Sequence, residues 1–298
     1  MITILFLSLC VISLILYIWR KKQPNKDFSP IWLRVKMWWG MFVVFSLATL
    51  SNPVVTLLSL MVLCFFALRE YFSLWQTRKS DRRLFLWAYV TIPIQFYWIY
   101  IEWYGMFIVF IPVYVFLFLP LPRMIGKGTV GFLRSVSSTQ WGLMLMVFGL
   151  SHLAYFPFAT PQYGANLVLF LVILTQLNDV IQNIYSIYFG KYKIVPSANP
   201  YITWGGMVFS LVMTMLVSFW LFRYLTPFPA LYGVLSGAVI SISGFIGILT
   251  VSVLRRDLLL GKDGSEKLIK GRYLNRVDSL AYTAPIFFHV TRYFFEFM

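Results

Sequence analysis

The charged side chains that border apolar segments are the residues of this sequence best suited to chemistry, and Asp179 is the first of them. It lies in the run Leu-Asn-Asp-Val-Ile-Gln-Asn at 177–183, inside or at the edge of an apolar helix. A carboxylate within a membrane span costs about 2.5–3.5 kcal/mol on insertion scales, so it usually has a partner or a function. Gln182 and Asn183 lie one turn further on, roughly on the same face. The run therefore indicates either a polar site or a helix end that emerges into water.

The segment 252–278 holds the second group of candidates, because seven basic residues and four acids lie there between two apolar runs. Arg255 and Arg256 directly follow the first run, at the depth of lipid headgroups, where guanidinium groups form paired hydrogen bonds to phosphate oxygens. Asp278 begins the second run, where a carboxylate could belong to a site or could simply cap the free amides of a helix.

Lys191 and Lys193 lie in a third polar segment, residues 190–205, whose Gly and Pro residues indicate fixed turns. These lysines could contact phosphates, or they could serve only to orient the chain in a membrane. His152 and His289 lie in or near apolar runs without a carboxylate or a second histidine at ligand spacing, and we interpret both as structural. The sequence has no P-loop, zinc-ligand spacing or dinucleotide fingerprint.

The elements that position these groups should be membrane helices. The chain has 298 residues, of which 60% are hydrophobic and 19% aromatic, and its mean hydropathy is +0.77. Repeated apolar runs match a bilayer core roughly 30 Å thick, and every backbone amide in lipid must be satisfied internally. We therefore predict an all-α fold, a polytopic integral membrane helical bundle of about ten transmembrane helices. Cys10 and Cys64 both lie in apolar runs, so no disulfide framework is expected.

The charges indicate how the spans are oriented. With the N-terminus outside, the alternate loops contain 23 of the 25 basic residues, which places those loops in the cytoplasm and the protein in a bacterial inner membrane. We divide the chain into N-terminal transmembrane helices at 1–135, with about five spans, and a C-terminal transmembrane domain at 136–298. The expected spans are residues 2–19, 37–50, 53–68, 84–101, 106–119, 140–156, 164–182, 206–222, 231–254 and 279–295.

The same polar segments resemble the phosphatidate cytidylyltransferase (CDP-diacylglycerol synthase) family, over about residues 176–288. The upstream pattern runs from Asp179 through Phe-Gly-Lys-Tyr-Lys-Ile-Val-Pro at 189–196 to Asn199-Pro200, Thr203 and Gly206. The family's C-terminal signature is S-x-x-K-R, K-D, H-G-G and D-R-x-D. Its counterparts here are Ser252-Val253-Leu254-Arg255-Arg256, Lys262-Asp263 (one position later), Lys270-Gly271-Arg272 and Asn275-Arg276-Val277-Asp278.

The resemblance implies an integral membrane enzyme that condenses CTP with phosphatidic acid to give CDP-diacylglycerol and pyrophosphate, with Mg²⁺ as cofactor. Two metal-ligand positions of the family are occupied here by Ile248, which cannot ligate a cation, and by Asn275, whose neutral amide is a weaker ligand for Mg²⁺ than a carboxylate. The implied catalytic residues are Asp179, Asp278 and Arg276. The implied metal ligands are Asp179, Asp278 and Asp263, and the implied phosphate-binding residues are Lys191, Lys193, Ser252, Arg255, Arg256, Lys262 and Lys270.

Three functions follow as hypotheses. The first is a phosphatidate cytidylyltransferase with impaired or altered activity, since nucleotidyl transfer depends on cations to offset the triphosphate charge. The second is an inactive homologue, without a cofactor, that binds anionic phospholipid or a partner enzyme. The third, a transporter, is disfavoured because no span core carries paired ionisable residues. Expected partners are phosphatidate or another anionic phospholipid, CTP if the protein is active, and a second copy in a homodimer; nucleic acid is not expected.

Overall fold

The computed structural model describes residues 52–74, 81–125, 131–199, 201–259 and 277–294, together with positions 10, 13, 14, 17, 18 and 39. Helices make up most of this part of the chain, and its one β-type pairing is an isolated bridge between Lys193 and Thr203. The helices are α3 (Pro53–Ser73), α4 (Arg82–Tyr100), α5 (Tyr104–Val109), η2 (Phe110–Val115), α6 (Phe116–Phe118), α7 (Leu121–Met124), α8 (Phe132–Gly142), η3 (Leu143–Gly149), α9 (Leu150–Ala159), α10 (Gly164–Phe189), α11 (Trp204–Leu225), α12 (Ala230–Leu259) and α14 (Leu280–Phe294).

Within the described residues, six helical segments are long and apolar enough to cross a membrane. They are 53–73, 104–124, 132–159, 164–189, 204–225 and 230–258. α4 and α14 correspond to two further expected spans, with 19 and 15 residues. The expected spans at 2–19 and 37–50 lie outside the fully described segments. The helical membrane fold is thus confirmed, whereas the count of about ten spans is not.

Two helices, α10 and α12, extend further into the polar segments than the apolar runs predict. α10 continues to Phe189 instead of residue 182, and α12 continues to Leu259 instead of residue 254. The polar residues there do not stop a helix, because Gly190 and Gly261 are the next residues that favour a break. Asp179 therefore lies ten residues before the end of α10, and Arg255 lies on a helix rather than in a loop.

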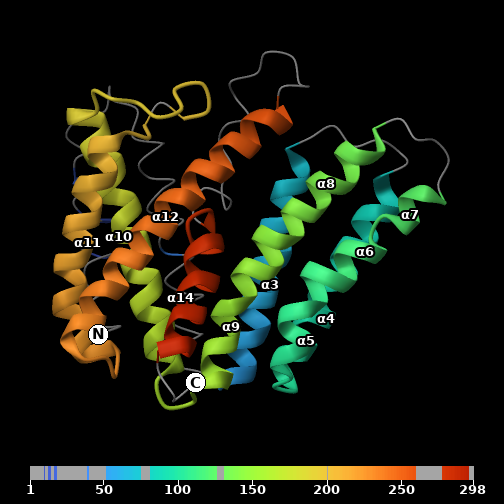
Figure 1. Ribbon diagram of the computed structural model, residues 1–298, viewed down its shortest axis with the longest axis horizontal. Coiled ribbons are helices and arrows are strands. Elements are labelled where there is room, and N and C mark those ends of the chain that lie inside the picture. Colours follow the sequence, from blue (N-terminus) through green and yellow to red (C-terminus); the bar gives the residue numbers. More distant parts are fainter. Residues whose placement is uncertain are drawn as a thin grey trace.

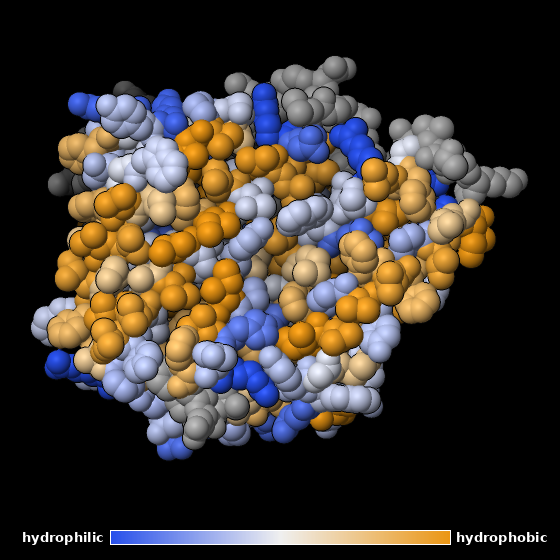
Figure 2. Space-filling model, viewed as in Figure 1, coloured by the Kyte–Doolittle hydropathy of each residue, from blue (hydrophilic) through white to orange (hydrophobic). Residues whose placement is uncertain are grey.

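The bundle has two sides that meet at α3, α8 and α9. α10, α11, α12 and α14 lie on one side and α4 to α7 on the other (Figure 1). A continuous apolar core connects them, and its fully buried aromatic side chains include Tyr71, Phe156, Phe170 and Phe287. Hydrophobic side chains cover much of the outer surface in the middle of the bundle, whereas hydrophilic ones gather at its two ends (Figure 2). This distribution is the one that a bilayer requires.

Candidate functional site

A row of buried polar side chains follows one face of α10, at the spacing of a helix face. Small hydroxyl residues of α11 and α12, among them Thr214 and Ser241, face this row. We call the row and these hydroxyl residues the polar seam. Asn178 connects the three helices: its Oδ1 accepts hydrogen bonds from Thr214 Oγ1 on α11 at 3.2 Å and Ser241 Oγ on α12 at 2.6 Å. The buried polar residues of α10 are Thr175, Asn178, Asp179, Gln182 and Ser186.

Glycines allow the start of α14 to pack closely against this seam. A Cβ on Gly247 of α12 would lie 2.9 Å from the carbonyl oxygen of Asp278 and 3.2 Å from Cα of Ser279. A Cβ on Gly149 of η3 would collide with the backbone of Ala281. Small residues let helix backbones approach closely in membranes. The start of α14 is therefore fixed between α12 and η3, facing α10.

Two acids and one base meet at this point, and we call Asp179, Arg255, Asp278 and Ser279 the acid–base cluster. Ser279 Oγ donates to Asp179 Oδ2 at 2.6 Å. Arg255 Nη2 donates to both carboxylate oxygens of Asp278, at 2.5 Å for Oδ1. The two side chains of this ion pair are only 15% and 7% exposed. The cluster thus joins α10, α12 and the start of α14.

Burial determines the protonation of Asp278, which lies just before the first turn of α14. Removal from water raises the pKa of this carboxyl to about 6, although the Arg255 guanidinium acts in the opposite direction. Desolvation disfavours the charged form of a carboxyl group, and a neighbouring cation favours it. Near neutral pH the carboxylate and the guanidinium therefore form a weakly stabilised ion pair.

The segment between α10 and α11 folds back over the same end of the seam. Ile194 N donates to Ile202 O at 3.0 Å, and Trp204 N donates to Tyr192 O at 3.1 Å. Thr203 Oγ1 accepts from Gly206 N at 3.1 Å and so caps α11. Asn199 Nδ2 donates to Ser252 Oγ at 3.4 Å, which ties the segment to α12 beside the acid–base cluster.

The structure brings some of the predicted site residues together and leaves others apart or undescribed. Asp179, Asp278, Arg255 and Ser252 lie at one end of the seam. Lys191, Lys193 and Arg256 are exposed at that end and do not enter the cluster. The remaining predicted residues, Lys262, Asp263, Lys270, Asn275 and Arg276, lie outside the described residues.

Sequence reasoning missed the residues that join these groups. Ser279 was not singled out, although it contacts Asp179 and lies one turn before Thr283, whose Oγ1 is 3.2 Å from that of Thr175. The four-residue spacing of Ser279 and Thr283 was the available signal.

Gln182 is 1% exposed, and both polar atoms of its amide lack a hydrogen-bond partner among the described residues. A buried amide of this kind is suited to a polar ligand in the seam.

The two histidines form a second cluster that spacing along the chain did not reveal. Their rings lie 5.3 Å apart, centroid to centroid. His152 Nδ1 is 2.8 Å from Phe148 O, and His289 Nδ1 is 3.4 Å from the Tyr104 hydroxyl. His152 is fully buried among aromatic rings, which agrees with a structural role.

The acid–base cluster also contains the described oxygens best suited to a magnesium ion. Asp179 and Asp278 supply carboxylates, the ligand type that Mg²⁺ prefers. In the described segments no group of three His, Cys, Asp or Glu residues is arranged to hold a metal. Because Arg255 contacts both oxygens of Asp278, a cation could bind that carboxylate only after the guanidinium has moved away.

Comparison with known sequences identifies the family of this chain. The family described as "Cytidylyltransferase family" matches residues 32–294. YnbB of Escherichia coli (strain K12), an uncharacterised protein, is 35% identical over 281 residues, which are 93% of this chain and 91% of that protein. The phosphatidate cytidylyltransferase of Haemophilus influenzae is 31% identical over 147 residues, 45% of this chain and 48% of its own. That of Chlamydia muridarum is 29% identical over 138 residues, 44% and 45% of the two chains. Although the similarity to these two named proteins spans less than half of either chain, the family match spans most of the sequence, and this protein belongs to the cytidylyltransferase family.

Proposed function

We propose that this membrane protein binds the headgroup of phosphatidate, or a similar anionic phospholipid, at the acid–base cluster and transfers a cytidylyl group to it only slowly. Membership of the cytidylyltransferase family and the similarity to proteins named phosphatidate cytidylyltransferase support the reaction class. In that reaction a phosphate oxygen of phosphatidate attacks the α-phosphorus of CTP. The bond to the β-phosphate breaks, and pyrophosphate leaves as CDP-diacylglycerol forms.

The observation that carries the proposal is the Arg255–Asp278 ion pair. A lipid phosphate is an anion whose oxygens match the fork of a guanidinium group, so it competes directly with Asp278 for Arg255. When Arg255 turns to the phosphate, the Asp278 carboxyl is released beside Ser279, the partner of Asp179, and a bound cation would favour its ionised form over the protonated one. Bound Mg²⁺ would then supply the positive charge that offsets the triphosphate and the departing pyrophosphate. Lipid binding thereby creates the site for the cation.

The slow rate follows from the residues at the two family ligand positions. Ile248 lies next to Gly247, the residue packed on the backbone of Asp278, and its side chain offers no oxygen. Asn275 offers a neutral amide oxygen, which holds a hard divalent cation less firmly than a carboxylate does. Lys191, Lys193 and Arg256 remain available as exposed phosphate-binding groups at the same end of the bundle.

A second candidate function, lipid binding without transfer, is favoured by the same ion pair. Arg255 can bind a headgroup whether or not a nucleotide follows, so the two activities are separable. In either case we propose that the acid–base cluster faces the cytoplasm from the inner membrane, because the alternate loops that the sequence predicts on that side contain 23 of the 25 basic residues. A homodimer and a partner enzyme remain compatible with both functions.

The test uses the purified protein in liposomes with labelled CTP, phosphatidate and Mg²⁺. We expect slow formation of CDP-diacylglycerol that Asp278→Ala abolishes. Arg255→Ala should weaken phosphatidate binding, whereas Arg223→Ala, an exposed arginine of α11 that is not among the predicted phosphate-binding residues, is the control.

A gain-of-function variant distinguishes the two candidates. Ile248→Asp combined with Asn275→Asp restores both family carboxylates and should raise turnover at least tenfold if the transfer site is otherwise intact. If neither the wild type nor this variant forms CDP-diacylglycerol while both bind phosphatidate, lipid binding alone is the function. If phosphatidate binds no better than a zwitterionic lipid, or equally well to Arg255→Ala, the whole proposal is refuted.

A further inference from the structure

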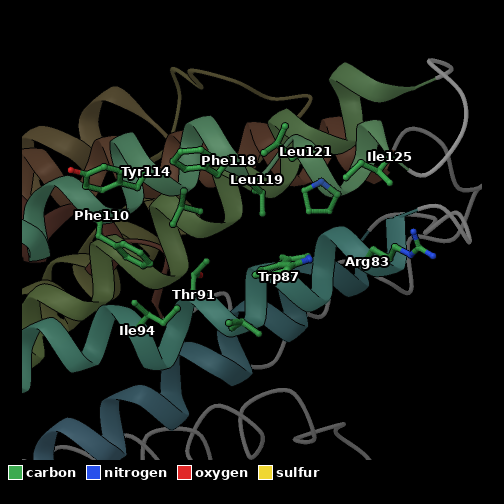
Figure 3. Close-up of a pocket in the computed structure, with 13 residues that line it drawn as sticks. Arg83, Trp87, Thr91, Ile94, Phe110, Tyr114, Phe118, Leu119, Leu121 and Ile125 are labelled. Atoms are coloured by element: carbon green, nitrogen blue, oxygen red, sulfur yellow. The ribbon is translucent and has the colours of Figure 1, made fainter.

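A cavity far from the acid–base cluster lies between α4 on one side and η2, α6 and α7 on the other. Its volume is about 490 Å³, within the range of roughly 300–1,000 Å³ that is common for small-molecule sites. Its walls are almost wholly apolar. Trp87 and Thr91 of α4 face Phe118 and Leu119 across it, and Ile94 and Phe110 lie at one end (Figure 3). We call it the α4–α6 groove.

The two walls are joined at both ends, which holds the groove open between them. The short turn 101–103 links α4 to α5 at one end. At the other end a buried ion pair connects Arg123 of α7 with Asp81, 3.3 Å apart, and Ser135 Oγ of α8 donates to Asp81 Oδ1 at 3.0 Å. Between these ends, Pro93 lies inside the continuous helix α4, and a π-helical segment with Pro112 replaces the regular helix opposite; both features bend helices.

The end of the groove near the ion pair carries net positive charge. Arg83 lines this end, is exposed, and extends away from the apolar floor (Figure 3). Asp81 is the acid nearest in sequence, and Arg123 and Ser135 already occupy its carboxylate. The other acid of residues 81–125, Glu102, lies at the opposite end of α4. An anion placed here would therefore meet the Arg83 guanidinium, and neither of the two acids of residues 81–125 is positioned to compete for it.

We propose that the α4–α6 groove binds an anionic glycerophospholipid, with one acyl chain between α4 and α6 and the phosphate against Arg83. An apolar slot of membrane depth that ends in a basic residue at the surface matches the two parts of such a lipid. Thr91 does not contradict an apolar occupant, because its hydroxyl already donates to Ala88 O at 2.7 Å. The site is independent of the proposed transfer function, since α4 to α7 contribute no residue to the acid–base cluster.

The experiment measures lipid retention by native mass spectrometry on the full-length protein purified in a neutral detergent. Phosphatidylglycerol and phosphatidylcholine with identical acyl chains are supplied in equal amounts. We expect the wild type to retain phosphatidylglycerol preferentially. Arg83→Ala should lower that retention about fivefold, the factor for loss of one basic contact with an anionic headgroup, while Arg83→Lys retains most of it. Arg82→Ala, one residue away and outside the groove lining, is the matched control.

Two further variants separate the groove from other lipid sites. Val90 lines the groove and is 38% exposed, so Val90→Trp should fill the slot without disturbing the core and should lower retention of both lipids. Leu86→Trp, on the same helix at 62% exposure and outside the lining, should not. Because Arg255 is itself proposed to bind an anionic phospholipid, the Arg83→Ala and Arg82→Ala variants are also compared in an Arg255→Ala background, where the fivefold difference between them should persist.

A photoreactive group at the end of the acyl chain provides an independent readout. Crosslinks to residues 87–119 support the proposal. Crosslinks found only elsewhere in the chain overturn it, as does equal retention of phosphatidylglycerol by the Arg83→Ala and Arg82→Ala variants. Wild-type protein that retains both lipids equally also overturns it, because the charge of Arg83 then plays no part.

Discussion

Replacement of Arg255 by Met tests how strongly the ion pair with Asp278 stabilises the fold. The change removes the guanidinium charge and keeps an unbranched stem of similar length. Truncation of one partner in a buried ion pair typically costs about 3–5 kcal/mol, because the other charge stays buried without compensation. Asp278 has a less costly alternative, since burial already raises its pKa to about 6 and the carboxyl can bind a proton instead.

The size of the effect follows from that pKa. At pH 7 a carboxyl with a pKa of about 6 gains only about 1 kcal/mol from ionisation. Once Arg255 is absent, the protein can lose no more than about this amount, because Asp278 then stays protonated. At pH 5 the wild-type carboxyl is already mostly protonated, and the loss falls close to zero.

The assay is the free energy of unfolding in mixed detergent micelles at pH 5, 6 and 7, for the wild type and Arg255→Met. We expect the difference between them to rise from near zero at pH 5 to about 1 kcal/mol at pH 7. In an Asp278→Asn background the same Arg255 change should show no such rise. A loss of about 3–5 kcal/mol that is equal at all three pH values would refute this reasoning, because it would mean that Asp278 cannot accept a proton when its partner is removed.

Three further predictions concern the same end of the bundle. Folding raises the pKa of Asp278 from 3.8 to about 6, so the stability gained from its protonated form is fully present below pH 3.8 and is lost as the pH rises. Between pH 3.8 and 7 the free energy of unfolding of the wild type should therefore fall by about 3 kcal/mol, whereas that of Asp278→Asn should not, in unfolding measurements at each pH. Gly247→Ala should lower the free energy of unfolding by about 1–3 kcal/mol and reduce phosphatidate binding, because its Cβ would lie 2.9 Å from the Asp278 carbonyl oxygen. Gly105→Ala, whose Cβ would lie 3.6 Å from its nearest neighbour, is the control in both assays. Equal effects of the two substitutions would contradict the close packing of α12 on α14. Asn178→Leu should cost about 2–4 kcal/mol in the same unfolding assay because two buried hydroxyl donors lose their acceptor, and a neutral result would show that the seam is not held by this amide.

The sequence was sufficient to predict the fold class and to locate the main ionisable groups. Hydropathy indicated membrane helices wherever the described chain has long helices, and the cost of a carboxylate in an apolar helix singled out Asp179. What the sequence could not predict was that Arg255 reaches Asp278. That contact depends on the continuation of α12 beyond its apolar run and on Gly247, which lets α14 approach. Both depend on packing between helices far apart in the sequence.

The groove and the histidine pair were missed for a similar reason. Pro93 and Pro112 indicate bends in two helices, but only the ion pair between Asp81 and Arg123 shows that those helices are tied together beyond the bends. His152 and His289 lie 137 positions apart in the chain, so no spacing rule could connect them. The roles of Lys262, Asp263, Lys270 and Arg276 stay predictions.

In the proposed function, the weakness of the Arg255–Asp278 pair at neutral pH allows the pair to act as a switch. To release Arg255, Asp278 would lose only the roughly 1 kcal/mol by which its ionised form is favoured at pH 7. A charge-assisted hydrogen bond contributes about 1.5–3 kcal/mol, and a phosphate can form two with one guanidinium. The exchange of partners therefore favours the lipid phosphate, whereas a neutral or zwitterionic headgroup gains too little to open the pair. Selectivity for an anionic phospholipid then arises from competition with Asp278, and it should weaken below pH 6, where a protonated Asp278 no longer holds Arg255 and other headgroups can approach it.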